Sequence, residues 1–231
     1  VHKIGKEMYS LMKRLFPICR SITGNGVRET LKILREYIPI KNVEITTSTK
    51  VLDWEIPNEW NINDAYIKTS NGDKIVDFKK NNLHVLGYSE PFEGKVKLEE
   101  LKNHIYTLPD QPDLIPYVTS YYQRRWGFCL SENQFKTLKN GIYEIQIDST
   151  LEPGNLTYAD LIVKGKSKKE ILISTYICHP SLANNELSGP VISTFLAKYL
   201  LEKNNNYYSY RFVFVPETIG TITYLSKHLK Y

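Results

Sequence analysis

One stretch, residues 157–189, constrains the fold more than any other part of this 231-residue chain. Two apolar runs, at 158–163 and 171–177, flank a turn at 165–169, which predicts two neighbouring strands. The second run has no polar alternation, as expected for a strand that is buried on both faces. A polar loop follows it and leads into an apolar segment at 190–201. The stretch therefore predicts an α/β fold.

A third apolar run, at 210–215, completes a strand–helix–strand unit, because residues 190–201 carry apolar side chains at helical spacing. A crossover of this kind connects parallel strands, so the strands at 171–177 and 210–215 should end at one edge of one sheet. In open α/β sheets, ligands bind just beyond the carboxyl ends of the strands. The residues that follow these two strands are therefore the candidates for a functional site.

A histidine and a carboxylate occupy these two strand ends. His179 follows the strand at 171–177, and Glu217 follows the strand at 210–215. A single histidine at such a position is more often a surface or capping residue than a ligand. Together the two residues form the smallest set for metal-assisted hydrolysis. Glu217 has one alternative role, because a carboxylate near a helix N-terminus is favourable in any protein.

The cysteines bear on both chemistry and compartment. Cys178 precedes His179, which raises the alternative of a nucleophilic Cys–His pair, but adjacent residues on a strand point to opposite faces. The other two cysteines are Cys19 and Cys129, and no two of the three have the spacing of a disulfide framework or a metal motif. This usage favours a reducing, cytoplasmic compartment.

The charge distribution argues against two classes of partner. The net charge is +5, from 30 basic and 25 acidic residues, and the charges are scattered along the chain. The sequence has no stripe of basic residues of the kind that would indicate nucleic-acid binding. No run of about 18 apolar residues predicts a membrane-spanning helix. We therefore expect neither a nucleic-acid partner nor a membrane segment.

The composition divides the chain into three segments. Residues 1–50 predict two amphipathic helices and a half-buried strand at 41–49. Residues 51–149 are aromatic and interrupted by prolines, and Asn71-Gly72 predicts a hairpin, so we expect an inserted β-rich domain. Residues 150–231 should continue the first segment as one α/β domain. In that domain we expect edge strands at 41–49 and 158–163 around the strand at 171–177.

Two arginines stand out in the aromatic segment. Its aromatic residues are more typical of a core than of a ligand platform. Arg124 and Arg125 lie between Tyr122 and Trp126 and are the exception, because paired arginines can hold an anion or a terminal carboxylate. We predict that they bind substrate.

The motifs together resemble the co-catalytic zinc aminopeptidases, and the whole chain more closely resembles bacterial aminopeptidase-like proteins. The resemblance rests on the strand-end His179, the Asn-Asn-Glu-Leu-Ser-Gly segment at 184–189, and the Pro-Glu-Thr-Ile-Gly segment at 216–220. It implies a three-layer zinc-exopeptidase-like sheet with helices on both faces, incomplete at its C-terminus, and an inserted β-rich domain. It also implies that the remaining metal ligands lie beyond residue 231.

The resemblance assigns roles to individual positions. His179 matches the first zinc ligand, and Glu217 matches the general base. Asn185 stands where the family has an aspartate that bridges two zinc ions, and Glu186 is next to it, so both are candidate metal ligands. Because an asparagine cannot supply the anionic bridge, either Glu186 replaces it or only one ion binds.

Two further positions depart from the family pattern. Ser181 stands where the family has the aspartate that orients the histidine. Thr218 replaces the carboxylate of the second metal. The resemblance thus implies one or two zinc ions, held with fewer carboxylates than the family uses.

Two functions follow as hypotheses. The first is a metal-dependent aminopeptidase-like hydrolase that cleaves an amide or peptide bond with metal-activated water, of which this chain is an N-terminal part that is inactive alone. Its substrate would be a small peptide or aminoacyl amide, and a homo-oligomer is compatible with the sequence. The second is a non-catalytic binding or assembly module derived from the same fold, acting in envelope polysaccharide biosynthesis. The losses at Asn185 and Thr218 motivate the second.

Overall fold

The computed structural model describes residues 2–229 and divides them into two compact units. The first unit contains the described residues up to Glu59 and from Pro153 onward, and the second is Trp60–Glu152. Within residues 2–229, no helix combines the length and the apolar character needed to cross a membrane.

A four-stranded mixed sheet, in the order β1-β10-β12-β11, forms the centre of the first unit. β1 (Lys41–Thr46) is antiparallel to β10 (Asn155–Val163), which is antiparallel to β12 (Ser209–Val215). β12 is parallel to β11 (Glu170–Tyr176), and this pairing confirms the predicted crossover. β1 joins β10, so the strand before residue 60 and the strands after residue 153 share one sheet.

Two expectations about this sheet are wrong. β12 lies between β10 and β11, so the two apolar runs that were expected to be neighbours do not pair with each other. β11 is an edge strand, with Ile171 39% and Leu172 59% exposed, and β10 is an inner strand. An uninterrupted apolar run predicts a strand, but it does not reveal which strand pairs on each side, because that depends on segments distant in sequence.

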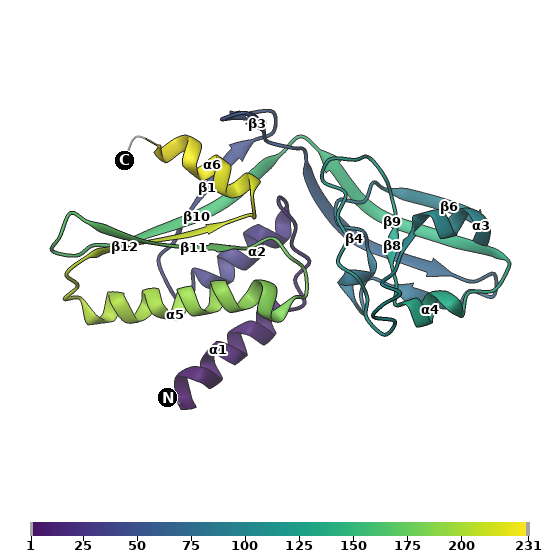
Figure 1. Cartoon of the computed structure of the whole chain (residues 1–231), viewed down its shortest axis with the longest axis horizontal. Helices are drawn as coiled ribbons and strands as arrows, with labels where there is room; N and C mark the ends of the chain where they lie inside the picture. Colours follow the sequence, from purple (N-terminus) through teal and green to yellow (C-terminus); the bar gives the residue numbers. More distant parts are fainter. Residues whose placement is uncertain (1, 230–231) are drawn as a thin grey trace. The chain divides into compact units, whose positions relative to one another are not determined.

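Helices cover both faces of this sheet (Figure 1), which confirms the three-layer α/β arrangement. α2 (Asn25–Leu34) and α5 (Ser188–Lys203) pack on one face, and α1 (His2–Leu15) packs against α5. α6 (Ile219–His228) packs on the other face, against β10 and β12.

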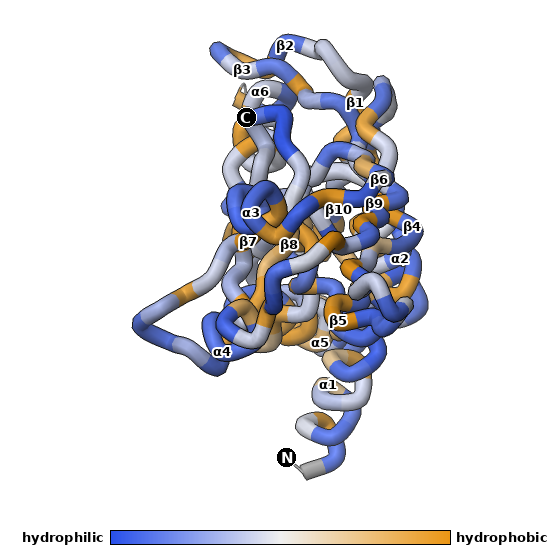
Figure 2. The backbone as a smooth tube through the Cα atoms, turned by 90° about the vertical axis from the view of Figure 1, so that its right-hand side faces the viewer, coloured by the Kyte–Doolittle hydropathy of each residue, from blue (hydrophilic) through white to orange (hydrophobic). Residues whose placement is uncertain are grey.

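The apolar core of the first unit is shared by the helices and the sheet. α1 contains both hydrophilic and hydrophobic residues (Figure 2). Its buried residues, Leu11 and Leu15, lie one turn apart, as expected for an amphipathic helix that packs against α5. The core residues include Leu11, Leu15, Leu31, Leu34, Ala159, Phe195, Phe212 and Phe214. Burial of these side chains fixes α1 and α2, and with them the segment between the two helices.

Gly26, in the first turn of α2, allows that segment to approach closely. A Cβ atom at Gly26 would lie 2.1 Å from the carbonyl oxygen of Cys19. We expect Gly26→Ala to lower the free energy of unfolding by about 1–3 kcal/mol, because the backbone of the segment would have to shift. Gly5→Ala in α1 is the matched control, since a Cβ there meets nothing within 4 Å. It should be neutral or stabilise by up to about 1 kcal/mol. Denaturant unfolding measures both, and equal effects would contradict this packing role.

The second unit is built on a four-stranded sheet in the order β5-β4-β9-β6. The four strands are β4 (Glu59–Lys68), β5 (Lys74–Asp77), β6 (Phe92–Lys97) and β9 (Ile142–Glu152). β4 and β5 are antiparallel on either side of Asn71-Gly72, as predicted, and Gly72 has a φ of +88°, which favours glycine.

Short elements complete both units. They are β2 (Lys50–Val51), β3 (Trp54–Glu55), η1 (Asn82–His84), α3 (Leu98–Leu101), η2 (Lys102–His104), β7 (Ile105–Tyr106), β8 (Phe128–Cys129) and α4 (Glu132–Lys136). Among the aromatic residues of the second unit, Trp60, Tyr88 and Tyr143 are buried, which is consistent with a core role.

Candidate active site

The ends of β11 and β12 bring His179 and Glu217 together. Nε2 of His179 lies 3.3 Å from Oε2 of Glu217. The backbone joins the two strand ends as well, because the Glu217 N–H donates to the sulfur of Cys178 at 3.2 Å. Parallel pairing of neighbouring strands thus places the two predicted residues side by side at one edge of the sheet.

Glu186 reaches His179 from the other side of the ring. It lies in η3 (Ala183–Leu187), a single π-helical turn, and is only 2% exposed. Its Oε2 accepts hydrogen bonds from both the backbone N–H and Nδ1 of His179, each at 3.0 Å. Because an ionised carboxylate can only accept, Nδ1 is the donor in this hydrogen bond, and Nε2 lies on the side of Glu217.

Arg20 is a site residue that the sequence did not indicate. Its side chain is fully buried, and its Nε lies 3.3 Å from Oε1 of Glu186. The same Nε donates to the backbone carbonyl of His179 at 3.0 Å. Burial lowers the pKa of the Arg20 guanidinium, and the Glu186 carboxylate opposes this shift by stabilising the charged form. No local signal could identify Arg20 as a site residue, since its partners at the site, His179 and Glu186, lie more than 150 residues away in sequence.

Asn185 and Ser181 make different contacts from those the resemblance implies. Asn185 is exposed, and its Oδ1 accepts a hydrogen bond from the Tyr176 hydroxyl at 2.6 Å. The Tyr176 ring stands edge-on to the His179 ring, with centroids 5.1 Å apart. The Ser181 hydroxyl donates to the carbonyl of Phe16 at 2.9 Å. The bond to Nδ1 that an aspartate at 181 would make is supplied by Glu186.

Backbone strain accompanies both strand ends. Ser181 has a φ of 38° and Thr218 a φ of 57°, in the region that glycine prefers. For a β-branched threonine this conformation is unfavourable. Residues in such conformations cost on the order of 1–3 kcal/mol and persist where the surrounding structure holds them. The turns that present His179 and Glu217 are therefore held by their tertiary contacts.

The Cys178–His179 pair is poorly suited to nucleophilic catalysis. The Cys178 sulfur lies 3.9 Å from Nδ1, but Nδ1 already donates to Glu186. Burial raises the pKa of the Cys178 thiol, with the Glu186 carboxylate as the next cause. The thiol therefore remains protonated near neutral pH, whereas the nucleophile in cysteine chemistry is the thiolate.

Buried thiols should make the protein alkali-sensitive. Burial raises the pKa of Cys129 from 9.0 to about 12. Below pH 9 the thiol is protonated in both states, so its contribution is complete. Between pH 9 and 12 the unfolded state loses the proton first, so the free energy of unfolding should fall. Denaturation midpoints at pH 8 to 10.5 should fall less steeply for Cys129→Ala than for wild type. Identical slopes would contradict the shift.

Arg124 and Arg125 lie in the second unit and have separate partners. Nε of Arg124 donates to Glu90 at 2.6 Å, with the arginine side chain 81% exposed. Arg125 donates to the Ser120 hydroxyl at 3.1 Å and to the Thr119 carbonyl at 3.0 Å. Arg125 thus stabilises the segment at 119–125 by hydrogen bonds within it. The binding of substrate by Arg124 and Arg125 stays a prediction.

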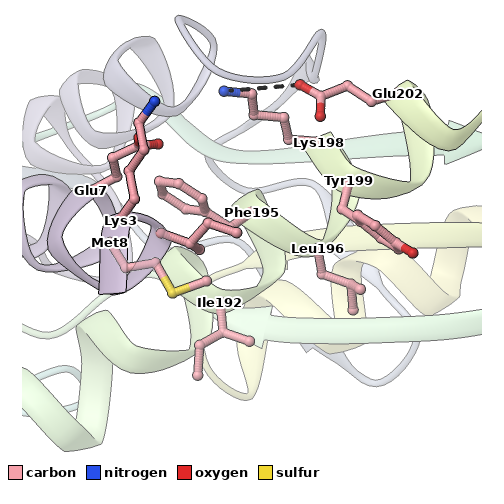
Figure 3. A pocket seen from close by; sticks show the side chains of 10 residues that line it. Lys3, Glu7, Met8, Ile192, Phe195, Leu196, Lys198, Tyr199 and Glu202 are labelled. Carbon is pink, nitrogen blue, oxygen red and sulfur yellow. Dashed lines mark ion pairs between the residues drawn. The ribbon is translucent and has the colours of Figure 1, made fainter. Parts of the chain in front are cut away.

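A hollow of about 510 Å³ lies between α1 and α5 (Figure 3). Its lining is mainly apolar, with lysine and glutamate side chains at the rim, and it includes Met8, Ile192 and Phe195. His179 and Glu217 are not among its lining residues. The hollow lacks the histidine–carboxylate chemistry of the strand ends, so we place the candidate site at the strand ends.

Comparison with known proteins defines the class of this fold. The chain superimposes on a peptidase M28 precursor from Shewanella amazonensis with a TM-score of 0.59 at 11% identity, covering 99% of this chain and 70% of that one. It superimposes on BSAP, a zinc aminopeptidase from Bacillus subtilis, with a TM-score of 0.58 at 12% identity, covering 95% and 64%. The chain therefore has the fold of the zinc aminopeptidases.

Within that class, the chain belongs to the family described as "Domain of unknown function (DUF4910)", whose model matches residues 9–231. A crystal structure of a "putative peptidase" from Clostridium acetobutylicum matches with a TM-score of 0.96 at 52% identity, over 99% of this chain and 54% of that one. A curated protein of the same organism is 53% identical over 224 residues. It is named "Putative polysaccharide biosynthesis protein with aminopeptidase-like domain", and this chain spans about half of its length.

Two sides of His179 offer ligands for the zinc ion that the fold class implies. On the inner side, the ligand atoms of Cys178, His179 and Glu186 lie within 4.8 Å of one another. Arg20 already supplies a positive charge there, and the raised pKa of the thiol opposes formation of the thiolate that a metal requires. On the outer side, Nε2 faces the carboxylate of Glu217, which is 55% exposed. The chemistry of the donors argues against a metal on the inner side, so Nε2, on the side of Glu217, is the candidate metal-binding atom of His179.

Proposed function

We propose that the full-length protein is a metal-dependent aminopeptidase-like hydrolase that cleaves an amide or peptide bond. The aminopeptidase-like fold supports this proposal. The observation that carries it is the 3.3 Å approach of His179 Nε2 and Glu217 Oε2 at the ends of two parallel strands. Since this chain spans about half of its relatives, the remaining ligands are expected from the rest of the polypeptide.

The two residues would have distinct tasks. His179 would bind zinc through Nε2, because its Nδ1 proton is committed to Glu186. When bound, zinc polarises a carbonyl and lowers the pKa of its water. Glu217 would accept the proton of the attacking water at its carboxylate and return it to the departing amine. Its position after β12, largely exposed, leaves it free to move a proton between the two.

We further propose that the site holds one zinc ion. A second ion would need the anionic bridge and the carboxylate that Asn185 and Thr218 lack. The Asn185 carbonyl oxygen is bonded to Tyr176, and Glu186 is bonded to His179. Zinc titration tests the ligand roles predicted for Asn185 and Glu186, since a second binding step would require at least one of them.

The substrate proposed is a small peptide or aminoacyl amide. Arg124 and Arg125 remain candidates for binding its carboxylate, although both already have partners in the second unit. We also propose a cytoplasmic location, which the three free cysteines support.

The decisive experiment measures metal content and turnover together. Full-length protein is purified, its zinc is quantified by mass spectrometry, and aminoacyl-nitroanilides are tested before and after chelation and zinc restoration. His179→Gln should lose zinc and turnover. His228→Gln, a histidine near the end of α6, is the control and should keep both. Stoichiometric zinc with no turnover on any aminoacyl or peptide amide would favour the alternative, a non-catalytic module, for which the name of the Clostridium relative suggests polysaccharide biosynthesis.

A further inference from the structure

We infer that the buried Arg20–Glu186 pair is a positioning device that fixes the tautomer and orientation of His179, so that Glu186 acts through the histidine and is not itself a metal ligand. The inference deepens the proposed site and rests on the proposed role of His179. It concerns which side of the His179 ring the pair holds and which side faces Glu217.

The Arg20–Glu186 pair makes three hydrogen bonds to His179. Arg20 Nε donates to its backbone carbonyl at 3.0 Å. Glu186 Oε2 accepts from its backbone N–H and from Nδ1, each at 3.0 Å. Backbone and ring are thus held by one ion pair whose two side chains are fully buried. Second partners that bind the free nitrogen of a metal-ligating histidine fix its tautomer and raise its basicity.

Arg20 is itself held rigidly. Its Nη1 donates to the carbonyl of Leu15, the last residue of α1, at 2.9 Å and to the Thr30 hydroxyl at 3.3 Å. The Thr30 hydroxyl in turn donates to the carbonyl of Gly26 at 2.8 Å. The guanidinium therefore connects the end of α1, the start of α2 and the strand-end histidine, so the orientation of His179 is tied to the opening helices.

The charges explain why Glu186 stays on the inner side. Within the described part of the chain, Glu186 Oε1 and Arg20 Nη2 are buried and have no hydrogen-bond partner. Their opposite charges, 3.3 Å apart between Nε and Oε1, compensate each other. A carboxylate that turned outward to a metal would leave the guanidinium buried without its counter-charge and would release Nδ1. Remaining with Arg20 is the favourable arrangement.

The tautomer of His179 is the direct test. In metal-free, full-length protein labelled with ¹⁵N-histidine, the neutral ring of His179 should carry its proton on Nδ1, the nitrogen that is hydrogen-bonded to Glu186. The His179→Gln spectrum identifies the signals by their loss. A protonated Nε2 with an unprotonated Nδ1 would overturn the inference without any need for a variant at the pair.

The double variant Arg20→Met/Glu186→Met removes both buried charges together, which avoids stranding one of them. It should lose the single Nδ1–H tautomer and bind zinc about 10–100-fold more weakly, as measured by calorimetric titration with zinc alone. Arg14→Met/Glu36→Met, which removes an exposed ion pair at the surface, is the matched control and should change neither readout. A double variant that keeps the tautomer and the zinc affinity would overturn the inference.

Glu186→Gln provides a second variant that needs no change at Arg20. The carboxamide can either accept from Nδ1 or donate to it, so both tautomers should appear. A ligand role predicts a different result, namely an altered cobalt(II) absorption spectrum with the tautomer of the metal-free ring unchanged. That result would overturn the inference. If wild-type protein binds no zinc and hydrolyses nothing, the proposed function fails, yet the tautomer measurement still decides the positioning role.

Discussion

Glu217→Gln in the full-length protein is expected to lower kcat by about 10²–10⁴-fold while zinc remains bound, which is the usual effect of removing a general base. A carboxamide keeps the size and polarity of the side chain but cannot accept the proton of water. Glu217 is suited to this role because it faces Nε2 of His179 at 3.3 Å. Turnover of an aminoacyl-nitroanilide and zinc content, measured on the same sample, test the expectation.

The alternative for Glu217 is a structural role at the start of α6. The residue that directly precedes this helix is Thr218, and its side chain makes no capping hydrogen bond. Loss of a helix cap costs about 1 kcal/mol and leaves turnover unchanged. Glu202→Gln, at the exposed end of α5, is the control for the substitution itself. Full turnover in Glu217→Gln, with or without a small loss of stability, would remove Glu217 from the mechanism.

Arg20→Met is expected to lower the free energy of unfolding by about 3–5 kcal/mol, because it leaves the Glu186 carboxylate buried without its counter-charge. Both side chains are fully buried, so no solvent screens the loss. The variant also removes the donors to the carbonyls of Leu15 and His179. Denaturant unfolding, followed by circular dichroism, measures the change.

An exposed ion pair in the same unit provides the comparison. Arg14 and Glu36 lie 2.6 Å apart, but their side chains are 46% and 49% exposed. Arg14→Met should lower the free energy of unfolding far less than Arg20→Met, since exposed pairs contribute little. Arg20→Met/Glu186→Met should be less destabilised than Arg20→Met alone, because replacing both charges leaves none uncompensated. A double variant less stable than the single variant would show that the pair does not act as a unit.

Local patterns in the sequence were sufficient for the main helices of the first unit, the longer strands of its sheet and the residues that follow β11 and β12. The apolar runs and the helical spacing between them predicted the parallel β11–β12 unit, and the chain places His179 and Glu217 directly after these strands. Their approach follows from parallel pairing alone. Asn71-Gly72 predicted its hairpin for a similar reason, because turn preferences are properties of neighbouring residues.

The order of the strands and the inner half of the site depend on tertiary structure. β12 lies between β10 and β11 because strand pairing depends on the interactions of all strands in the sheet. The apolar runs by themselves do not specify which strands become neighbours. Asn185 is exposed to solvent and its neighbour Glu186 is buried, because both lie in a π-helical turn that orients them differently. Arg20 contacts His179 across 159 positions of sequence. Contacts of this kind form only when the helices and the sheet have packed. Packing removes the water that would otherwise solvate the charges. Each buried charge must then be compensated by the side chains that the fold places next to it.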